Sequence, residues 1–574
     1  MEKTLLGLTN PQKSIWLTEQ FYNGSCINNI CGTVRINEPI EIDLLRQAIQ
    51  QLIEENDSFR LRFCIDEDGT VKQYLSDSSD FSMEVHVLDS NQDLISLQEN
   101  SVNKRFELFH KPLYRFDLYQ FKDHTGGFVL TIHHLIGDAC TSSLIASKFS
   151  DIYLSLKNNQ PRSKQDTSYL HFISSEQSYL QSEKFQKDQI FWKELFSQET
   201  ELASIPSSSS SSATTSDACR KRFEISSEKL KQIQDYCSSH QISVFNFFMA
   251  IYAIYIGRVS HLEHFVLGTP ILNRSTFAEK NTTGMFISTM PFQFDLSQDL
   301  SFSDLASKIV KDTMSMFRHQ KYPYQMILEE MRKSQPNLPN LYHVLISYQN
   351  TRTNRNESDL DYTVEWTFNH NVADSIQIHL FDMNDLGILN VAYDFKTELY
   401  TSSDIESLHT RILNMIDQVL LQPDLPIHAL EIVTPEEKFK LLETFNQTDL
   451  PYDEEKTLID LFEEQVQKTP DAIALVFEKQ TMSYRLLNQK VNSLATYLRS
   501  QGIINNSIVG VMLPRSFEMI IALLAVLKAG GAYIPLDPEY PQERISYILE
   551  NSQSNLILSS KNLQEKLEQL SFSR

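Results

Sequence analysis

The stretch Phe128-Val-Leu-Thr-Ile-His-His-Leu-Ile-Gly-Asp-Ala139 is the most informative part of this chain. Residues 128–132 are apolar or β-branched and predict a buried strand, and residues 142–149 have the spacing of a helix. Two histidines therefore lie where a strand ends, a position at which a rigid sheet can present a titratable side chain to a cleft. We expect an α/β fold with a candidate site at this turn.

Adjacent residues of a strand point to opposite faces of its sheet, so at most one of the two histidines enters a given cleft. We predict that His134 faces the cleft and that His133 is structural. Asp138 is close enough to orient the turn or to take a cationic partner, and the small residues Gly137 and Ala139 leave room for a ligand. The motif alone leaves an active site and a purely structural pair of histidines equally open.

Composition narrows the class of protein. The chain has 574 residues, which predicts about three or four folding units. The net charge of -23, from 51 basic and 74 acidic side chains, argues against nucleic acid and anionic membranes as partners. The six cysteines show no C-x-x-C pair and the histidines no metal-ligand spacing, so we predict neither a disulfide framework nor a metal site. The N-terminus lacks the apolar core of a signal peptide and no apolar run approaches the roughly 20 residues of a spanning helix, so we expect a cytoplasmic protein.

The order of predicted elements indicates two α/β lobes in tandem. The first, residues 1–175, contains a helix at 42–54 and the strand at 128–133. The second, residues 176–440, repeats this pattern and contains a very apolar helix at 244–256. Clefts between lobes are preferred ligand sites, so we expect the site between them.

The rest of the chain is predicted to form a linker at 441–456 and a third unit at 457–574. Within the third unit, helices at 458–468, 484–501 and 517–527 alternate with strands at 472–477 and 507–512, which is typical of a parallel sheet with crossover helices. In the second lobe, residues 174–196 predict one polar helical stretch, and the serine run at 207–212 predicts a surface loop.

Six motifs, in order, resemble those of the condensation domains of nonribosomal peptide synthetases. They are Leu8-Thr-Asn-Pro-Gln-Lys-Ser-Ile-Trp16, Asn56-Asp-Ser-Phe-Arg-Leu-Arg-Phe63, the His-His-x-x-x-Asp motif at 133–138, Gly268-Thr-Pro-Ile-Leu-Asn-Arg274, Gly284-Met-Phe-Ile-Ser-Thr289 and His319-Gln-Lys-Tyr-Pro323. The resemblance covers roughly residues 1–440. It implies two lobes resembling chloramphenicol acetyltransferase, arranged as a V with a central cleft.

The third unit resembles the beginning of an adenylation domain. Met482-Ser-Tyr484 and Leu527-Lys-Ala-Gly-Gly-Ala-Tyr-Ile-Pro-Leu-Asp537 look like the first two motifs of that family. Its Ser/Thr/Gly-rich phosphate loop and its catalytic lysine are absent. We therefore expect an incomplete adenylation segment that does not activate amino acids.

Within the condensation family, Trp16-Leu-Thr-Glu-Gln-Phe-Tyr22, Gly284-Met-Phe-Ile-Ser-Thr289 and Arg318-His-Gln-Lys-Tyr-Pro-Tyr324 look most like the starter type of lipopeptide synthetases such as surfactin synthetase. The resemblance implies N-acylation of a carrier-bound first amino acid by a fatty acyl thioester, in lipopeptide antibiotic synthesis. The first motif begins within ten residues of Met1, so we expect no fused upstream carrier. The implied partners are a peptidyl carrier protein as acceptor, acyl-CoA or an acyl carrier protein as donor, and the downstream adenylation domain. No cofactor is expected to bind directly, because 4′-phosphopantetheine belongs to the carriers.

The resemblance also assigns roles to residues. It makes His134 the catalytic residue and places Ser288 and Thr289 along a substrate tunnel. Asp138 could be a second acid–base group, but the resemblance pairs it with Arg60 instead. The family has glycine where this chain has Ala139, and an alanine would be strained there if the backbone needed a positive φ.

Three other functions remain open. The chain could be an ordinary peptide-bond-forming condensation domain, or an inactive docking module whose histidines are only structural. An epimerisation domain uses the same motif but is disfavoured, because an adenylation-like segment follows.

Overall fold

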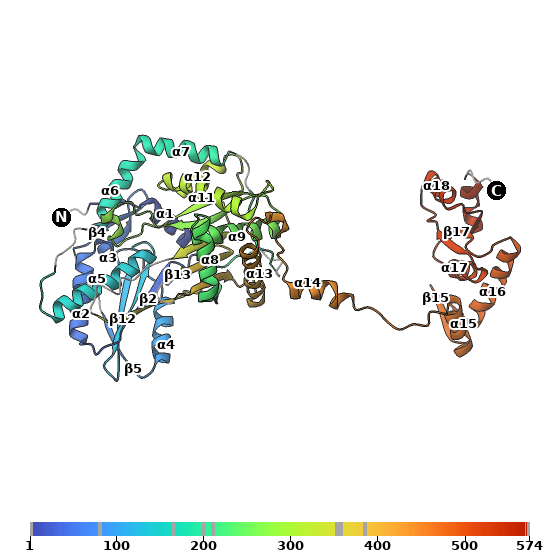
Figure 1. Cartoon of the computed structure of the whole chain (residues 1–574), viewed down its shortest axis with the longest axis horizontal. Coiled ribbons are helices and arrows are strands. Elements are labelled where there is room, and N and C mark those ends of the chain that lie inside the picture. The colour runs from blue at the N-terminus through green and yellow to red at the C-terminus, as the bar shows by residue number, and fades with distance from the viewer. Residues whose placement is uncertain are drawn as a thin grey trace. The chain divides into compact units, whose positions relative to one another are not determined.

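The computed structural model describes residues 4–77, 83–162, 167–197, 201–207, 213–349, 360–382, 387–568 and 570. The chain forms two compact units, Met1–Leu442 and Glu443–Arg574, each with its own fold (Figure 1). Of the serine loop predicted at 207–212, only Ser207 lies within the described residues.

The first sheet of the larger unit carries the histidine motif. Its strand order is β12-β2-β7-β6-β5, with β2 (Asn29–Ile36), β5 (Glu84–Leu88), β6 (Tyr114–Phe121), β7 (Gly126–His133) and β12 (Tyr362–Thr367). Helices α2 (Ile42–Glu55) and α5 (Ala139–Lys157) cover one face, and α4 (Asn91–Val102) packs on the other. Phe128, Leu130 and Ile132 point toward α2 and α5, whereas Val129 points toward α4. Both faces of β7 are thus buried, which explains its continuous apolar run.

Strand β12 enters this first sheet from the C-terminal half of the chain. It pairs antiparallel with β2, Trp366 opposite Gly32. The sequence pattern placed residues 176–440 in a separate lobe and did not indicate this crossing. A strand's pattern reports that it is half buried, but not which sheet it joins.

The second sheet has the order β10-β9-β11-β13-β14-β8. Its strands are β8 (Ala218–Ile225), β9 (His264–Ile271), β10 (Ser288–Asp295), β11 (Val344–Gln349), β13 (Ile376–Asp382) and β14 (Leu389–Lys396). Helices α8 (Ser227–Ser239), α9 (Val244–Ser260), α11 (Phe302–Arg318) and α13 (Ser402–Leu421) contribute to one core with it. Helix α9 is apolar all round because it is the buried centre of this core.

No single helix in the described ranges is long and apolar enough to cross a membrane; α8 and α9 reach that length and composition only as a pair bent by 100°.

The remaining elements of the larger unit surround these sheets. Residues 174–196, predicted as one helical stretch, form two helices because α6 ends at Leu180 and Ser182 caps α7 by accepting a hydrogen bond from the Phe185 amide. The other elements are β1 (Leu6–Gly7), α1 (Asn10–Phe21), α3 (Asp57–Arg60), β3 (Leu61–Ile65), β4 (Val71–Leu75), α6 (Tyr169–Leu180), α7 (Glu183–Leu195), α10 (Phe277–Lys280), α12 (Tyr324–Met331) and α14 (Pro435–Leu442).

The smaller unit contains a parallel three-stranded sheet, β18-β17-β19, as the alternation of elements predicts. The predicted strand at 472–477 does not join it: β15 forms an antiparallel hairpin with β16 through a tight turn at 478–479. The elements are α15 (Leu458–Lys468), β15 (Ile473–Phe477), β16 (Gln480–Ser483), α16 (Tyr484–Ser500), β17 (Ile508–Met512), α17 (Phe517–Ala529), β18 (Ala532–Pro535), α18 (Gln542–Ser552), β19 (Leu556–Ser559) and α19 (Gln564–Glu568).

Candidate active site

The histidine motif forms the turn that joins β7 to α5. His133 is the last residue of β7, and Asp138 is the N-cap of α5. The His134 amide donates to the Asn28 carbonyl at 2.8 Å, and the Ile136 amide donates to the His133 carbonyl at 3.0 Å. These bonds hold the backbone of His134 between a sheet and a helix N-terminus.

His133 is a buried residue with both ring nitrogens engaged. Its side chain is 3% exposed, and its Nε2 lies 3.4 Å from a carboxylate oxygen of Glu19. Its Nδ1 accepts a hydrogen bond from the Leu135 amide at 3.2 Å. Because Nδ1 acts as an acceptor, we infer that the ring proton is on Nε2 and faces Glu19. These contacts fit the structural role predicted for His133.

His134 differs from its neighbour because the residue is only partly buried. Its buried Nδ1 makes no hydrogen bond of good geometry. Burial lowers the pKa of His134 from its usual 6.5, and the carboxylate of Asp138 offsets only part of this shift. The imidazole is therefore neutral near pH 7 and has the protonation state required of a base or a hydrogen-bond acceptor.

Asp138 is a fully buried carboxylate whose oxygens are saturated with donors. It accepts hydrogen bonds from the amide and hydroxyl of Thr141 at 2.8 and 3.0 Å, and from two nitrogens of Arg274 at 2.8 and 3.1 Å. The amides of Phe286 and Ile287 donate to it at 3.1 and 3.2 Å. Burial alone would raise the pKa of Asp138, but the charge and hydrogen bonds of Arg274 hold it below its usual value. Asp138 therefore ties the motif turn to the C-terminal half of the unit.

The predicted ion pair between Asp138 and Arg60 is wrong. Arg60 pairs instead with Asp57 at 2.7 Å, three residues earlier in α3. The reason for expecting a partner was correct, since a buried carboxylate needs a cation. Arg274 supplies it through a two-pronged contact, and its side chain is 1% exposed. This residue ends one of the six quoted motifs, so the sequence held the right candidate without indicating its role.

The small residues of the motif have a different function from the one expected. A Cβ atom on Gly137 would lie 2.6 Å from Ile132 Cδ1 and 3.0 Å from Thr141 Cγ2. Protein side chains therefore occupy the space beside Gly137, and the predicted room for a ligand is wrong. Ala139 is the first residue of α5 and has no positive φ, so the strain considered for an alanine here does not arise.

Ser288 and Thr289 begin β10, opposite Ile271 and Pro270 of β9, and both are partly exposed. The side chain of Thr289 forms a hydrogen bond with Tyr342. Their place along a substrate tunnel stays a prediction.

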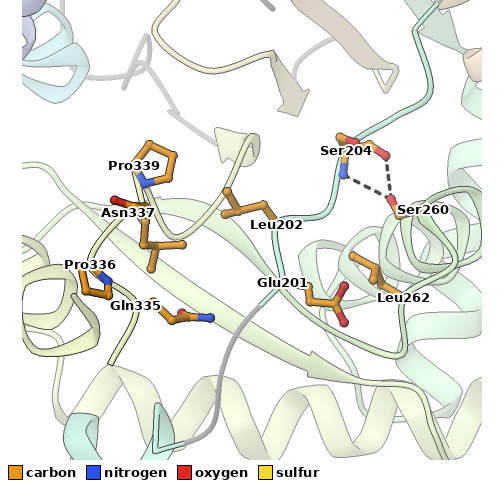
Figure 2. A pocket seen from close by; sticks show the side chains of 10 residues that line it. Glu201, Leu202, Ser204, Ser260, Leu262, Gln335, Pro336, Asn337 and Pro339 are labelled. Atoms are coloured by element: carbon orange, nitrogen blue, oxygen red, sulfur yellow. Dashed lines mark hydrogen bonds between the residues drawn. The ribbon is translucent and has the colours of Figure 1, made fainter. Parts of the chain in front are cut away.

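A cavity of about 590 Å³ opens elsewhere in the larger unit (Figure 2). Leu202, Leu262 and Leu338 contribute apolar side chains to its lining, and Glu201 and Gln335 contribute polar ones. It includes neither histidine of the motif, so it is separate from the candidate site.

One group among the described residues brings potential metal ligands together. The ligand atoms of Glu84, His86 and Asp117 lie within 4.8 Å of one another on β5 and β6. His86 Nε2 is 3.8 Å from each carboxylate, and the side chain of Glu84 is 71% exposed. This arrangement equally suits a surface histidine-carboxylate ion pair, and it lies apart from the histidine motif.

Comparison with known families identifies both units. The model of the family described as "Condensation domain" matches residues 2–442, and that described as "AMP-binding enzyme" matches residues 462–572. The chain belongs to the condensation-domain family, whose members in nonribosomal peptide synthetases are amide-bond-forming acyltransferases, and it continues into part of an AMP-binding domain. The resemblance found in the sequence motifs is confirmed.

Curated relatives lie among antibiotic and lipopeptide synthetases. Surfactin synthase subunit 1 of Bacillus subtilis is 33% identical over 97% of this chain and 16% of that protein. A plipastatin synthase of the same species is 32% identical over 97% of this chain and 22% of that protein. The chain thus spans about a fifth of the length of these relatives, or less.

Solved structures confirm the fold. The four-domain nonribosomal peptide synthetase AB3403, bound to AMP and glycine, aligns over the whole chain and 44% of its own length, with a TM-score of 0.84 and 19% identity. The starter condensation domain of rhizomide synthetase RzmA, in complex with C8-CoA, covers 75% of this chain and 98% of its own, with a TM-score of 0.65 and 20% identity. The expected acetyltransferase-like condensation fold with an adenylation segment is therefore confirmed.

Proposed function

We propose that this chain joins a fatty acyl thioester to the α-amino group of an amino acid held on a carrier protein. The observation that carries the proposal is His134, a partly buried residue whose imidazole is neutral near pH 7 and whose backbone is fixed at the end of β7. The sequence strings of the starter type and the likeness to a starter condensation domain in complex with C8-CoA support the choice of an acyl donor.

In the proposed reaction the amine attacks the thioester carbonyl, so that a C–N bond forms and the C–S bond breaks. The imidazole of His134 takes the proton that the nitrogen loses and passes it to the departing thiolate, which leaves as a free thiol. General-base catalysis of this kind contributes roughly 10² to 10⁴ in rate. Holding both substrates at one site contributes further, because effective molarities on the order of 10⁵ M are reached by well-oriented reactants.

We assign His134 alone a chemical role. The saturated carboxylate of Asp138 has no oxygen left for proton transfer, and the contacts of His133 account for both of its nitrogens. Phosphopantetheine arms belong to the carrier partners, and acyl-CoA is a substrate rather than a resident cofactor.

Intact mass spectrometry of an aminoacyl-loaded carrier, incubated with the protein and a panel of acyl-CoAs, tests the proposal. A mass gain of one acyl group is the expected result. His134→Ala should lower the rate by roughly 10² to 10⁴ with an unchanged melting temperature, and His171→Ala, at an exposed histidine on α6, should change neither.

Other outcomes select the alternatives. A carrier modified by peptidyl-carrier donors but not by any acyl thioester identifies an ordinary condensation domain. Carrier binding without any product, in wild type and His134→Ala alike, identifies a docking module and refutes the enzymatic proposal.

A further inference from the structure

The backbone partner of His134 lies in a segment that two other side chains hold by hydrogen bonds. The carbonyl of Asn28 accepts the hydrogen bond from the His134 amide, one residue beyond the last pair of the β2–β7 ladder, Asn29 opposite His133. Any shift of Asn28 is therefore transmitted directly to the backbone of the proposed catalytic histidine.

Glu19 of α1 holds Asn28 through the side-chain amide. Its carboxylate accepts a hydrogen bond from Asn28 Nδ2 at 2.7 Å and lies 3.4 Å from Nε2 of His133. The Glu19 side chain is 11% exposed. Burial alone would raise the pKa of Glu19, but the hydrogen bonds from His133 and Asn28 hold it below its usual value. One carboxylate thus contacts both His133, the residue before His134, and Asn28, whose carbonyl accepts the hydrogen bond from the His134 amide.

Asn369 holds the same segment through its backbone carbonyls. Its Nδ2 donates to the carbonyls of Cys26, Ile27 and Asn29 at 3.3, 2.8 and 3.0 Å. Its Oδ1 accepts from the Asn371 amide at 3.1 Å, which fixes the orientation of its own side chain. Asn369 follows the crossing strand β12, so these bonds join the C-terminal half of the unit to the 26–29 segment, which contacts the His134 amide through Asn28.

We propose that Glu19 and Asn369 are positioning residues of the acyl-transfer site, which clamp the 26–29 segment and so fix the direction of the His134 imidazole. This inference rests on the proposed function. A misplacement of about 1 Å at a reacting group can lower a rate by about 10². Loss of either clamp residue is therefore expected to lower kcat by about 10- to 100-fold and to leave KM within about twofold, since neither residue is proposed to touch substrate.

The test compares Asn369→Ala, Asn369→Asp, Glu19→Ala and Glu19→Gln in the full chain. Asn369→Asp keeps the shape of the side chain but removes its donor, so it should lose as much activity as Asn369→Ala. Glu19→Gln keeps an acceptor for Asn28 and should lose less than Glu19→Ala. Asn414→Ala is the matched control, because Asn414 of α13 also donates to backbone carbonyls, those of Glu431 and Val433.

A spectroscopic readout separates positioning from a general loss of structure. Histidine-selective ¹³C labelling, with the His134 signal identified by its absence in His134→Ala, follows the environment and the titration of this imidazole. The clamp variants should shift this signal and its pKa, and Asn414→Ala should not. Should Glu19→Ala fail to fold, Asn369→Asp and Glu19→Gln still provide both measurements.

An unmoved His134 signal in the clamp variants, or a kcat equal to that of Asn414→Ala, would overturn the inference. If the wild-type protein forms no amide, the proposed function fails, whereas the signal of His134 still reports whether the clamp holds the ring. If wild type is active, His134→Ala is inactive and the Asn369 variants remain at wild-type kcat, only the clamp fails.

Discussion

The buried pair of Asp138 and Arg274 offers the sharpest test of how the motif is held. We expect Asp138→Ala and Arg274→Ala each to destabilise the larger unit strongly, and Arg60→Ala to have little effect. The sequence resemblance assigned Arg60 as the partner of Asp138, whereas the structure assigns Arg274. The comparison therefore tests the tertiary contact itself.

The size of the effect follows from burial. The two side chains are 0% and 1% exposed, and breaking a buried pair by removing one partner costs about 3–5 kcal/mol, because the other charge stays buried. Asp138→Ala also removes the N-cap of α5, a further loss of about 1 kcal/mol. Arg60 and Asp57 are 25% and 14% exposed, and a partly exposed pair of this kind contributes about 1 kcal/mol or less.

A double-mutant cycle measured by urea unfolding gives the coupling energy directly. Tryptophan fluorescence reports on the larger unit alone, because all three tryptophans, Trp16, Trp192 and Trp366, lie within it. We expect the Asp138–Arg274 cycle to show a coupling of about 2–3 kcal/mol, at the upper end of values for residues in contact. The Asp138–Arg60 cycle should be additive within about 0.5 kcal/mol. Coupling to Arg60 in place of Arg274 would refute this account of the motif.

Three further predictions concern pH and packing. Because burial lowers the pKa of His134, the protonation step that this imidazole adds to the rate profile should have its midpoint below pH 6.5, the usual histidine value; a midpoint above pH 6.5 for the step that disappears in His134→Ala would contradict this assignment. His409 is 5% exposed, and burial lowers its pKa to about 4. As pH falls, this histidine is protonated in the unfolded chain before it is protonated in the folded one, so the free energy of unfolding should drop by about 3 kcal/mol between pH 6.5 and 4. His409→Gln should flatten the dependence of the free energy of unfolding on pH in this range, measured by urea unfolding. Gly284 has φ +150°, and a Cβ there would lie 2.1 Å from the Tyr169 ring, so Gly284→Ala should lower the free energy of unfolding by about 2 kcal/mol or more. Gly69 has φ +77° but open space around it, so Gly69→Ala should lower the free energy of unfolding by only about 1 kcal/mol.

Much of the fold could be predicted from local pattern. The strand at 128–133, the helix at 42–54 and the parallel sheet of the smaller unit all follow from apolar periodicity, because each element places its buried face at a fixed spacing. The crossing of β12 into the first sheet could not be predicted in this way, because strand pairing depends on which edge is free in three dimensions.

The candidate site was predictable only in part. The position of His134 at the end of β7 follows from the sequence, as does the need of Asp138 for a cation. The roles of Glu19 and Asn369 gave no signal in the sequence, since an acidic residue on a helix and an asparagine in a loop are typical of solvent-facing positions.

The sequence by itself therefore determined the elements, their family motifs and the placement of one histidine at a strand end, because these depend on residues close together in the chain. The tertiary structure alone decided the partners. Arg274 lies 136 positions from Asp138, and Asn369 lies 340 positions from Asn29. Contacts at such separations arise only when the folded chain brings distant segments together, and burial then makes them selective, since an unpaired charge or carbonyl away from water is costly.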